Sequence, residues 1–368
     1  MNKNKPAGEK QLKNQKKIYI KPELKEYGAI HEFTKALTGS MLTDGGVNPS
    51  NKTMTCVSLP SYLEEHRWLL QDNNVQMQFQ KALAAAVKPG DVVLDLGTGT
   101  GLHAFFAVQA GASRVYAVDS EPVLEMAKAI SRNNGFDDRI TFIQAHSDSL
   151  ELPEKVDVIV TNIGFFSTLR YLPSVIKRCL KPGGKVLPEN LRMGISLLED
   201  ESFFNSNVKF WATQPWGLDM QAIAPAAACR PQYGTWDLTQ FISDTKELQP
   251  IDLRTEKPLS FVSEQQLTVS RTGVLHAIIG WYTYELGGGV SFSTKPPLRL
   301  SNQIWNQWAL PFETPLKVQQ GETVTVKIQL NLVPGYDDAI WRWEISTASD
   351  HRKQSSFDSV ALSSVALN

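Results

Sequence analysis

The amino-acid sequence predicts two structural parts in one chain, an α/β domain with a parallel sheet followed by a largely β domain. Helix-like and strand-like hydrophobic patterns alternate over residues 59–188, as expected when helices connect parallel strands. Beyond residue 189, short runs such as TVTVKI at 323–328 alternate apolar with polar residues. That pattern is typical of antiparallel strands with one face toward solvent. Eight of the nine tryptophans follow residue 189, which favours a well-packed β-barrel or sandwich.

Composition and charge exclude several classes of protein. The 368 residues carry 37 Lys and Arg against 38 Asp and Glu, a net charge of −1, so no long-range field favours a nucleic acid or a membrane surface. The longest apolar run, 274–282, is about half of the roughly 18 residues that cross a membrane. The N-terminus is polar and lysine-rich, unlike a secretory signal. We therefore expect a cytoplasmic protein without nucleic-acid or membrane partners.

The cysteines and histidines give no sign of a metal site. Cys56, Cys179 and Cys229 are far apart in the sequence, and the six histidines show no paired spacing. Neither a disulfide framework nor a zinc site is expected from such a distribution. We predict no bound metal.

A glycine-rich loop follows the first hydrophobic strand of the α/β part. Residues 92–101 read VVLDLGTGTG, with Gly97, Gly99 and Gly101 at alternate positions. Glycines there let the backbone turn sharply and approach a ligand more closely than any Cβ would allow. The next strand ends in Asp119, where a carboxylate can accept hydrogen bonds from ribose hydroxyls. A third strand leads to Asp148, which is placed to accept from an adenine amine.

The loop differs from the dinucleotide fingerprint, because its glycines are spaced GxGxG and not GxGxxG. Strand, glycine loop, helix and two strand-end acids in this order resemble class I S-adenosylmethionine-dependent methyltransferases. That resemblance implies a Rossmann-like domain with a seven-stranded sheet and S-adenosylmethionine as the cofactor. The cofactor-binding candidates are Asp72, Asp95, Gly97, Gly99, Gly101, Asp119, Ser147 and Asp148.

Within that class, residues 59–343 resemble the protein arginine methyltransferases. The resemblance is carried by HRWLLQD at 66–72, LELPEKVDVIV at 150–160, GLDM at 217–220, HAIIGWY at 276–282 and SFST at 291–294, with Trp305 where a Thr-His-Trp motif falls. It implies a β-barrel after the Rossmann-like domain and a helical dimerisation arm near 200–235 in a homodimer. We accordingly expect a tail and N-terminal arm over 1–55, the cofactor domain over 56–188 and the barrel domain over 189–368.

The departures from that family concern its chemistry. Two glutamates that hold the guanidinium in the family correspond here to Asn162 and Arg170. The histidine of the Thr-His-Trp motif corresponds to Ile304. The arginine that binds the cofactor carboxylate corresponds to Val75 or Gln76.

These departures predict a different acceptor. Two unit charges about 4 Å apart interact by on the order of 4 kcal/mol at an effective dielectric of 20, so Arg170 beside the acceptor would repel a guanidinium. We therefore expect a non-guanidine N or O acceptor on a small molecule or peptide, with Asn162 orienting the acceptor and Arg170 binding an anionic group. The catalytic candidates are Asn162, Phe165, Arg170 and Trp305.

Other interpretations remain open at this stage. Arg170 can equally cap a helix or face solvent. The chain can also be an arginine methyltransferase with a rebuilt acceptor site, or a catalytically silent scaffold that keeps only the fold and the dimer. The intact glycine loop and strand-end acids favour cofactor binding and an active enzyme.

The N-terminal segment carries a second resemblance. Its residues Tyr19, Pro22, Leu24, Gly28 and Thr34 follow the spacing of lasso-type ribosomal peptide leaders. Such leaders add a strand to a small peptide-recognition domain, so residues 19–34 would recruit a partner in ribosomal-peptide tailoring. The alternative is an amphipathic arm that folds onto its own catalytic domain.

Overall fold

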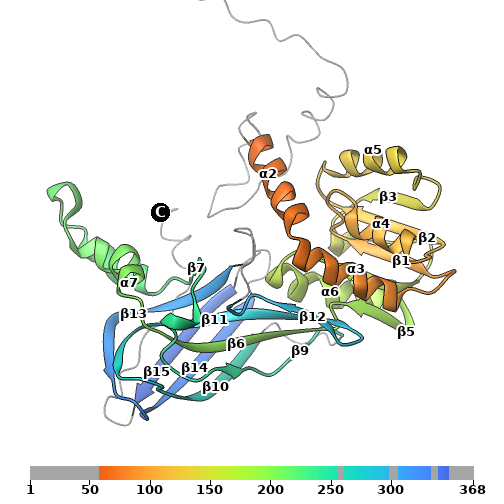
Figure 1. The fold of residues 1–368 in the computed structure, drawn as a ribbon. Helices are drawn as coiled ribbons and strands as arrows, with labels where there is room; N and C mark the ends of the chain where they lie inside the picture. Colours follow the sequence, from red (N-terminus) through yellow and green to blue (C-terminus); the bar gives the residue numbers. More distant parts are fainter. Residues whose placement is uncertain (1–57, 255–259, 298–305, 333–338, 348–368) are drawn as a thin grey trace, which may run out of the picture.

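The computed structural model describes residues 58–254, 260–297, 306–332 and 339–347 of the chain (Figure 1). The leader-like segment 19–34 and Trp305 lie outside the described residues. Within the described ranges, a parallel α/β sheet precedes antiparallel sheets, which confirms the predicted fold class.

The first part is a Rossmann-like parallel sheet with strand order β3-β2-β1-β4-β5. Its strands are β1 (Val92–Leu96), β2 (Arg114–Asp119), β3 (Ile140–Gln144), β4 (Val156–Thr161) and β5 (Leu180–Leu187). All five residues of β1 are buried, because helices cover both faces of a parallel sheet. The sheet has five strands where the sequence analysis expected seven, since the chain continues from β5 into β6 of the neighbouring antiparallel sheet.

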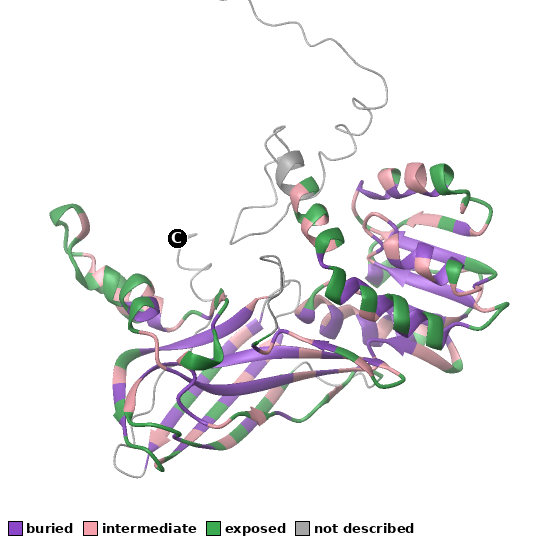
Figure 2. Ribbon diagram, in the orientation of Figure 1, coloured by how far each residue is buried: buried purple, intermediate pink, exposed green. Residues whose placement is uncertain are grey.

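Helices pack against this sheet, and they carry both buried and exposed residues, as Figure 2 shows. They are α2 (Ser58–Gln71), α3 (Asn73–Ala86), α4 (Leu102–Gln109), α5 (Leu124–Asn134), α6 (Phe165–Cys179) and the short η2 (Ser147–Ser149). Asp72 begins α3, where its Oδ1 accepts from the backbone N–H of Val75 at 3.2 Å. Of these helices, α2, α3 and α4 lie near the carboxyl end of β1.

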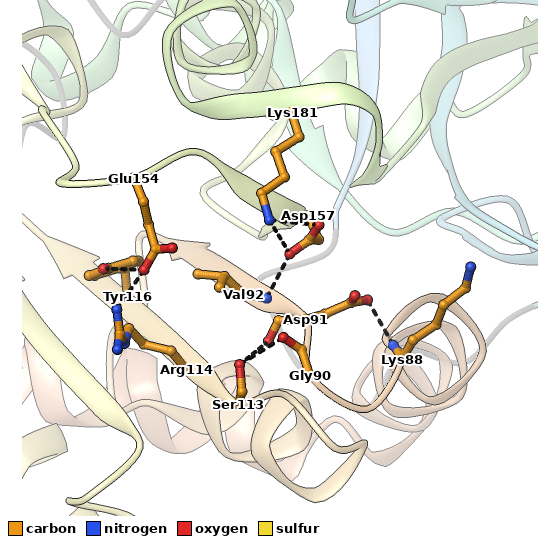
Figure 3. A network of polar contacts seen from close by, with 10 residues as sticks. All are labelled: Lys88, Gly90, Asp91, Val92, Ser113, Arg114, Tyr116, Glu154, Asp157 and Lys181. Atoms are coloured by element: carbon orange, nitrogen blue, oxygen red, sulfur yellow. Dashed lines mark hydrogen bonds and ion pairs between the residues drawn. The ribbon is translucent and has the colours of Figure 1, made fainter.

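A network of polar contacts ties together the beginnings of the parallel strands (Figure 3). Asp157 accepts from the backbone N–H of Val92 at 2.9 Å and from Lys181 Nζ at 2.8 Å, which joins β1, β4 and β5. Glu154 accepts from Arg114 Nη1 at 2.6 Å, which adds β2. This network lies at the amino ends of the strands, so the carboxyl ends are left for a ligand, as in other open α/β sheets.

The second part contains two antiparallel sheets, one of seven strands ordered β7-β13-β11-β6-β8 with β12 and β9 beside it, and one of three ordered β10-β14-β15. Their strands are β6 (Asn190–Leu198), β7 (Gln232–Gly234), β8 (Lys246–Glu247), β9 (Ile251–Asp252), β10 (Ser260–Thr268), β11 (Gly273–Gly287), β12 (Val290–Ser293), β13 (Gln307–Val318), β14 (Thr323–Leu332) and β15 (Ala339–Thr347). The core between the sheets includes Trp308, Trp341 and Trp343, which are fully buried. Trp341 and Trp343 are therefore part of the barrel core.

A helical arm protrudes from the barrel near β7 and β13 (Figure 1). It comprises α7 (Glu201–Asn207), η3 (Lys209–Ala212), η4 (Pro215–Gly217), η5 (Gln221–Ile223) and α8 (Ala224–Ala228), and the short η6 (Leu238–Gln240) follows β7. Asp200 anchors the arm, accepting from Trp236 Nε1 at 3.1 Å and Gln240 Nε2 at 2.8 Å. Within the arm, Trp216 is 98% exposed and Leu218 is 57% exposed. Among the described residues, no helix has the length and apolar character that a membrane span requires.

Candidate functional site

A cavity of about 770 Å³ lies at the carboxyl ends of the parallel strands. Residues of β1 and β2, of the loop after β4 and of helices α2, α3, α4 and α6 line it, and β11 contributes Tyr282 and Tyr284 from the barrel. Both parts of the molecule therefore contribute to one site.

The glycine loop forms the floor of this cavity. Gly97 and Gly99 have φ values of +73° and +54° and both line the cavity. A Cβ on Gly97 would lie 2.0 Å from Ile163 Cγ2, and one on Gly99 would lie 2.9 Å from His66 Cε1. The loop therefore needs glycine for backbone conformation and for close packing. Gly101 lies outside the cavity lining and begins α4 in the left-handed conformation.

Asp95 supports the loop from below and does not line the cavity. It is completely buried, and its Oδ2 accepts from Thr98 Oγ1 at 2.6 Å and from the backbone N–H of Ala104 at 2.9 Å. Its Oδ1 has no hydrogen-bond partner among the described residues. Burial raises the pKa of Asp95 to about 7. The carboxyl group thus holds the loop in shape from within the core.

Asp119 lies in the cavity lining at the end of β2. Its Oδ2 accepts from the backbone N–H of Gly99 at 2.8 Å and its Oδ1 from that of Glu121 at 2.9 Å. Burial raises the pKa of Asp119, while these hydrogen bonds act in the opposite direction. Each oxygen keeps a second lone pair, so the carboxylate can still accept from two ribose hydroxyls.

Where adenine is expected to bind, the backbone of residues 147–148 shapes the cavity more than the side chain of Asp148 does. Ser147 lines the cavity, but the Asp148 side chain is 68% exposed and lies outside the lining. Arg178 Nη1 and Nη2 donate to the backbone carbonyls of Asp148 and Ser147, respectively. Arg178 thereby fixes this turn from α6, a role that the sequence analysis did not predict. Asp72 likewise lies outside the lining, buried at the start of α3.

The expected acceptor side begins directly after β4. Thr161 Oγ1 donates to the carbonyl of Leu96 at 2.8 Å, which joins the ends of β4 and β1 and places Asn162 in the cavity lining. Asn162 Oδ1 is buried and has no hydrogen-bond partner in the described part of the chain. A buried acceptor of this kind is costly unless a ligand satisfies it.

Aromatic rings from α6 and β11 surround the same side of the cavity. Phe165 stacks on Tyr282 with ring centroids 4.2 Å apart, and Phe166 meets Phe165 edge to face at 5.5 Å. Tyr282 and Tyr284 are two residues apart on β11, so their side chains leave the same face of the strand. Burial raises the pKa of Tyr284, so the phenol stays protonated. Phe165 was predicted at this site, whereas the two tyrosines were not, and their i, i+2 spacing on one strand was the available signal.

Arg170 does not take part in this lining. It is half-buried on α6, and its guanidinium carbon lies 5.9 Å from the ring centroid of Tyr171. The repulsion expected between Arg170 and a guanidinium acceptor therefore has no structural basis. The charged side chains in the lining are instead Glu65, Asp119 and Glu121, with no Lys or Arg among the described lining residues. The cavity thus favours a cationic acceptor.

Two family models match consecutive regions of the chain. Residues 191–346 match the arginine methyltransferase oligomerization subdomain, and residues 76–189 match the ribosomal protein L11 methyltransferase (PrmA). The border between these matches coincides with the passage from β5 to β6.

Curated relatives extend across both regions. Protein arginine N-methyltransferase 1 of Dictyostelium discoideum is 30% identical over 278 residues, which cover 72% of this chain and 81% of the relative. Protein arginine N-methyltransferase 1.1 of Arabidopsis thaliana is 33% identical over 248 residues, but the match spans only 62% of its length and 64% of this chain.

Among solved structures, a chain of the "Trypanosoma brucei PRMT1 enzyme-prozyme heterotetrameric complex with AdoHcy" superposes with a TM-score of 0.74 and 26% identity. It covers 81% of this chain and 99% of the matched chain. The curated relatives are named protein arginine N-methyltransferases, and this contradicts the expected non-guanidine acceptor. That expectation was wrong because it rested on Arg170 lying at the acceptor, which the structure places outside the cavity lining.

Proposed function

Because the chain belongs to the protein arginine N-methyltransferase family, we propose that it transfers a methyl group from S-adenosylmethionine to a guanidinium nitrogen of a protein arginine. The observation that carries this proposal is the cavity lining, in which carboxylates and aromatic rings gather without a described cationic side chain. In this proposal residues 56–188 bind the cofactor, and residues 189–368 form the barrel that completes the acceptor side.

The cavity floor fits the adenosyl part of the cofactor. Gly97 and Gly99 leave no room for a Cβ, and Asp119 offers two oxygens toward the ribose hydroxyls. When bound, S-adenosylmethionine supplies an already activated methyl group. The protein therefore needs mainly to hold the nucleophile in line and to exclude water.

Asn162 and the aromatic rings take the place of the family's carboxylate pair. The buried Oδ1 of Asn162 accepts a guanidinium N–H and so orients the reacting nitrogen. The faces of Phe166 and Tyr282 attract the guanidinium through their ring quadrupoles, an effect that grows as water is excluded. Methylation of the nitrogen releases one proton. We assign this proton to Glu65, a carboxylate in the cavity lining.

Mass spectrometry tests the proposed acceptor directly. The full chain is incubated with S-adenosylmethionine and a set of arginine-containing proteins, and we expect one-methyl mass increases that fragment to arginine side chains. Exclusive modification of lysine, carboxylate or hydroxyl groups would contradict the proposal.

Replacing the buried amide tests the acceptor side separately. Asn162→Leu removes a hydrogen bond to a charged group, so we expect kcat/KM for the arginine substrate to fall about tenfold or more, with the Kd for S-adenosylhomocysteine unchanged. Asn133→Leu, on the exposed face of α5, is the control and should change neither value. An Asn162 variant with full activity would remove this residue from the acceptor site.

The exposed arm supports a homodimer. Phe210, Trp216 and Leu218 are exposed apolar residues on one protruding segment, within the matched oligomerization subdomain. Such an apolar surface is typical of a protein contact. A molar mass in solution equal to that of one 41.0 kDa chain would contradict the dimer.

A further inference from the structure

The amino-acid end of the proposed cofactor meets an unusual surface in this cavity. A methionine moiety carries a carboxylate and an ammonium group, and a carboxylate is normally matched by charged or N–H donors. The described residues that line the cavity include no Lys or Arg. Of the two positions considered for the family's arginine, Val75 is 1% exposed within the hydrophobic core, whereas Gln76 lines the cavity.

Gln76 is held in a fixed orientation beside a second lining residue. Its Nε2 donates to the carbonyl of Leu69 at 3.0 Å, and its Oε1 lies 3.0 Å from His103 Nε2. Gln76 and His103 are each 8% exposed. The His103 ring packs against Phe79, with ring centroids 4.4 Å apart. Helices α2, α3 and α4 thus converge on one polar pair between the core and the cavity.

The hydrogen bonds within this pair determine which donor and acceptor atoms remain for a ligand. An amide oxygen can only accept, so His103 Nε2 must carry the proton of that contact. Burial lowers the pKa of His103 to about 4, so near neutral pH the ring is uncharged and Nδ1 is an acceptor. Gln76 Nε2 has two hydrogens, and only one is used by Leu69. The pair therefore offers one donor and one acceptor.

We propose that Gln76 and His103 bind the amino-acid end of the cofactor, with Gln76 Nε2–H donating to the carboxylate and His103 Nδ1 accepting from the ammonium group. This assignment rests on the proposed function only for the identity of the cofactor. A neutral amide replaces a charged guanidinium, so the carboxylate contributes less to affinity than it would in an ion pair.

Two ligands that differ only at this end test the assignment by calorimetry. S-adenosylhomocysteine carries the amino acid, and 5′-methylthioadenosine lacks it. We expect Gln76→Leu to weaken S-adenosylhomocysteine binding about tenfold while the Kd of 5′-methylthioadenosine stays within about twofold. The control Gln80→Leu, exposed on the same helix, should leave both affinities unchanged.

A second variant keeps the test valid if leucine disturbs the packing. Gln76→Glu can still accept from His103 Nε2 but has no N–H donor and adds a negative charge. It should therefore weaken S-adenosylhomocysteine more than 5′-methylthioadenosine. Equal weakening of both ligands, or an unchanged ratio, overturns the assignment of the pair. If the wild-type protein binds neither ligand, the proposed function itself fails.

Discussion

The glycine loop at residues 97–101 and the acceptor side at residues 162–171 line the same cavity, yet they depend on different kinds of contact. The loop is shaped by backbone hydrogen bonds, such as those from Gly97 N–H and Thr98 N–H to the carbonyl of Val118 at 2.8 and 2.9 Å. The acceptor side is shaped by side chains from α6 and from β11, more than 100 residues later in the chain. The first can be derived from a local motif, whereas the second depends on how the barrel meets the parallel sheet.

The largest effect should come from the loop. Gly97→Ala would place a Cβ 2.0 Å from Ile163 Cγ2 at a φ of +73°. Because a misplacement of about 1 Å can cost roughly 100-fold in rate, we expect a loss of that order in kcat/KM, together with a weaker affinity for S-adenosylhomocysteine measured by calorimetry.

Gly135→Ala is the matched control for this substitution. Its φ is +69°, but a Cβ there has no atom within 4 Å. The left-handed conformation alone should cost about 1 kcal/mol of unfolding free energy and leave the affinity unchanged. Similar affinity losses in both variants would mean that backbone strain, and not the contact with Ile163, governs the loop.

An intermediate effect should come from the carboxyl group beneath the loop. Because burial raises the folded-state pKa of Asp95 from 3.8 to about 7, the folded protein holds a proton there that the unfolded chain releases above pH 3.8. Stability from this group is present below that pH and is lost as pH rises toward 7, by about 1.4 kcal/mol per pH unit.

Asp95→Asn removes this titration and keeps an oxygen for Thr98 and Ala104. The unfolding free energy of the variant relative to wild type, from urea titrations at pH 5, 6 and 7, should therefore increase with pH. His103 acts in the opposite direction, because its lowered pKa of about 4 makes stability fall as pH falls from 6.5. The two effects oppose each other in the wild-type protein, so only the difference between variant and wild type isolates the contribution of Asp95.

The smallest effect should come from Arg170, on the acceptor side. Arg170→Gln changes a side chain outside the cavity lining, and we expect kcat/KM for an arginine substrate to stay within about twofold of wild type. A gain or loss of tenfold would show that the guanidinium reaches the acceptor, and the comparison between the two sides of the cavity would need revision.

The sequence was informative where one local segment fixes both conformation and chemistry. Gly97, Gly99 and Asp119 lie in the cavity lining, at positions that a single βα turn and the next strand end define. Asp95, Asp148 and Arg170 are not among the described residues that line the cavity, although their motif positions suggested contact with a ligand. Helix periodicity alone puts Arg170 on the same face of α6 as Phe166 and Ser167, which do line the cavity, so its position in the helix does not predict that it is absent from the lining.

By itself, the sequence determined the order of the two sheets, the glycine loop and the strand-end acid, because hydrophobic periodicity and glycine conformation act over a few neighbouring residues. Only the tertiary structure decided that Tyr282 and Tyr284 face Phe165, that Gln76 and not Val75 reaches the cavity, and that no described cation lines it. Those outcomes depend on packing between segments far apart in the chain, where the burial of one side chain is set by residues that no local pattern contains.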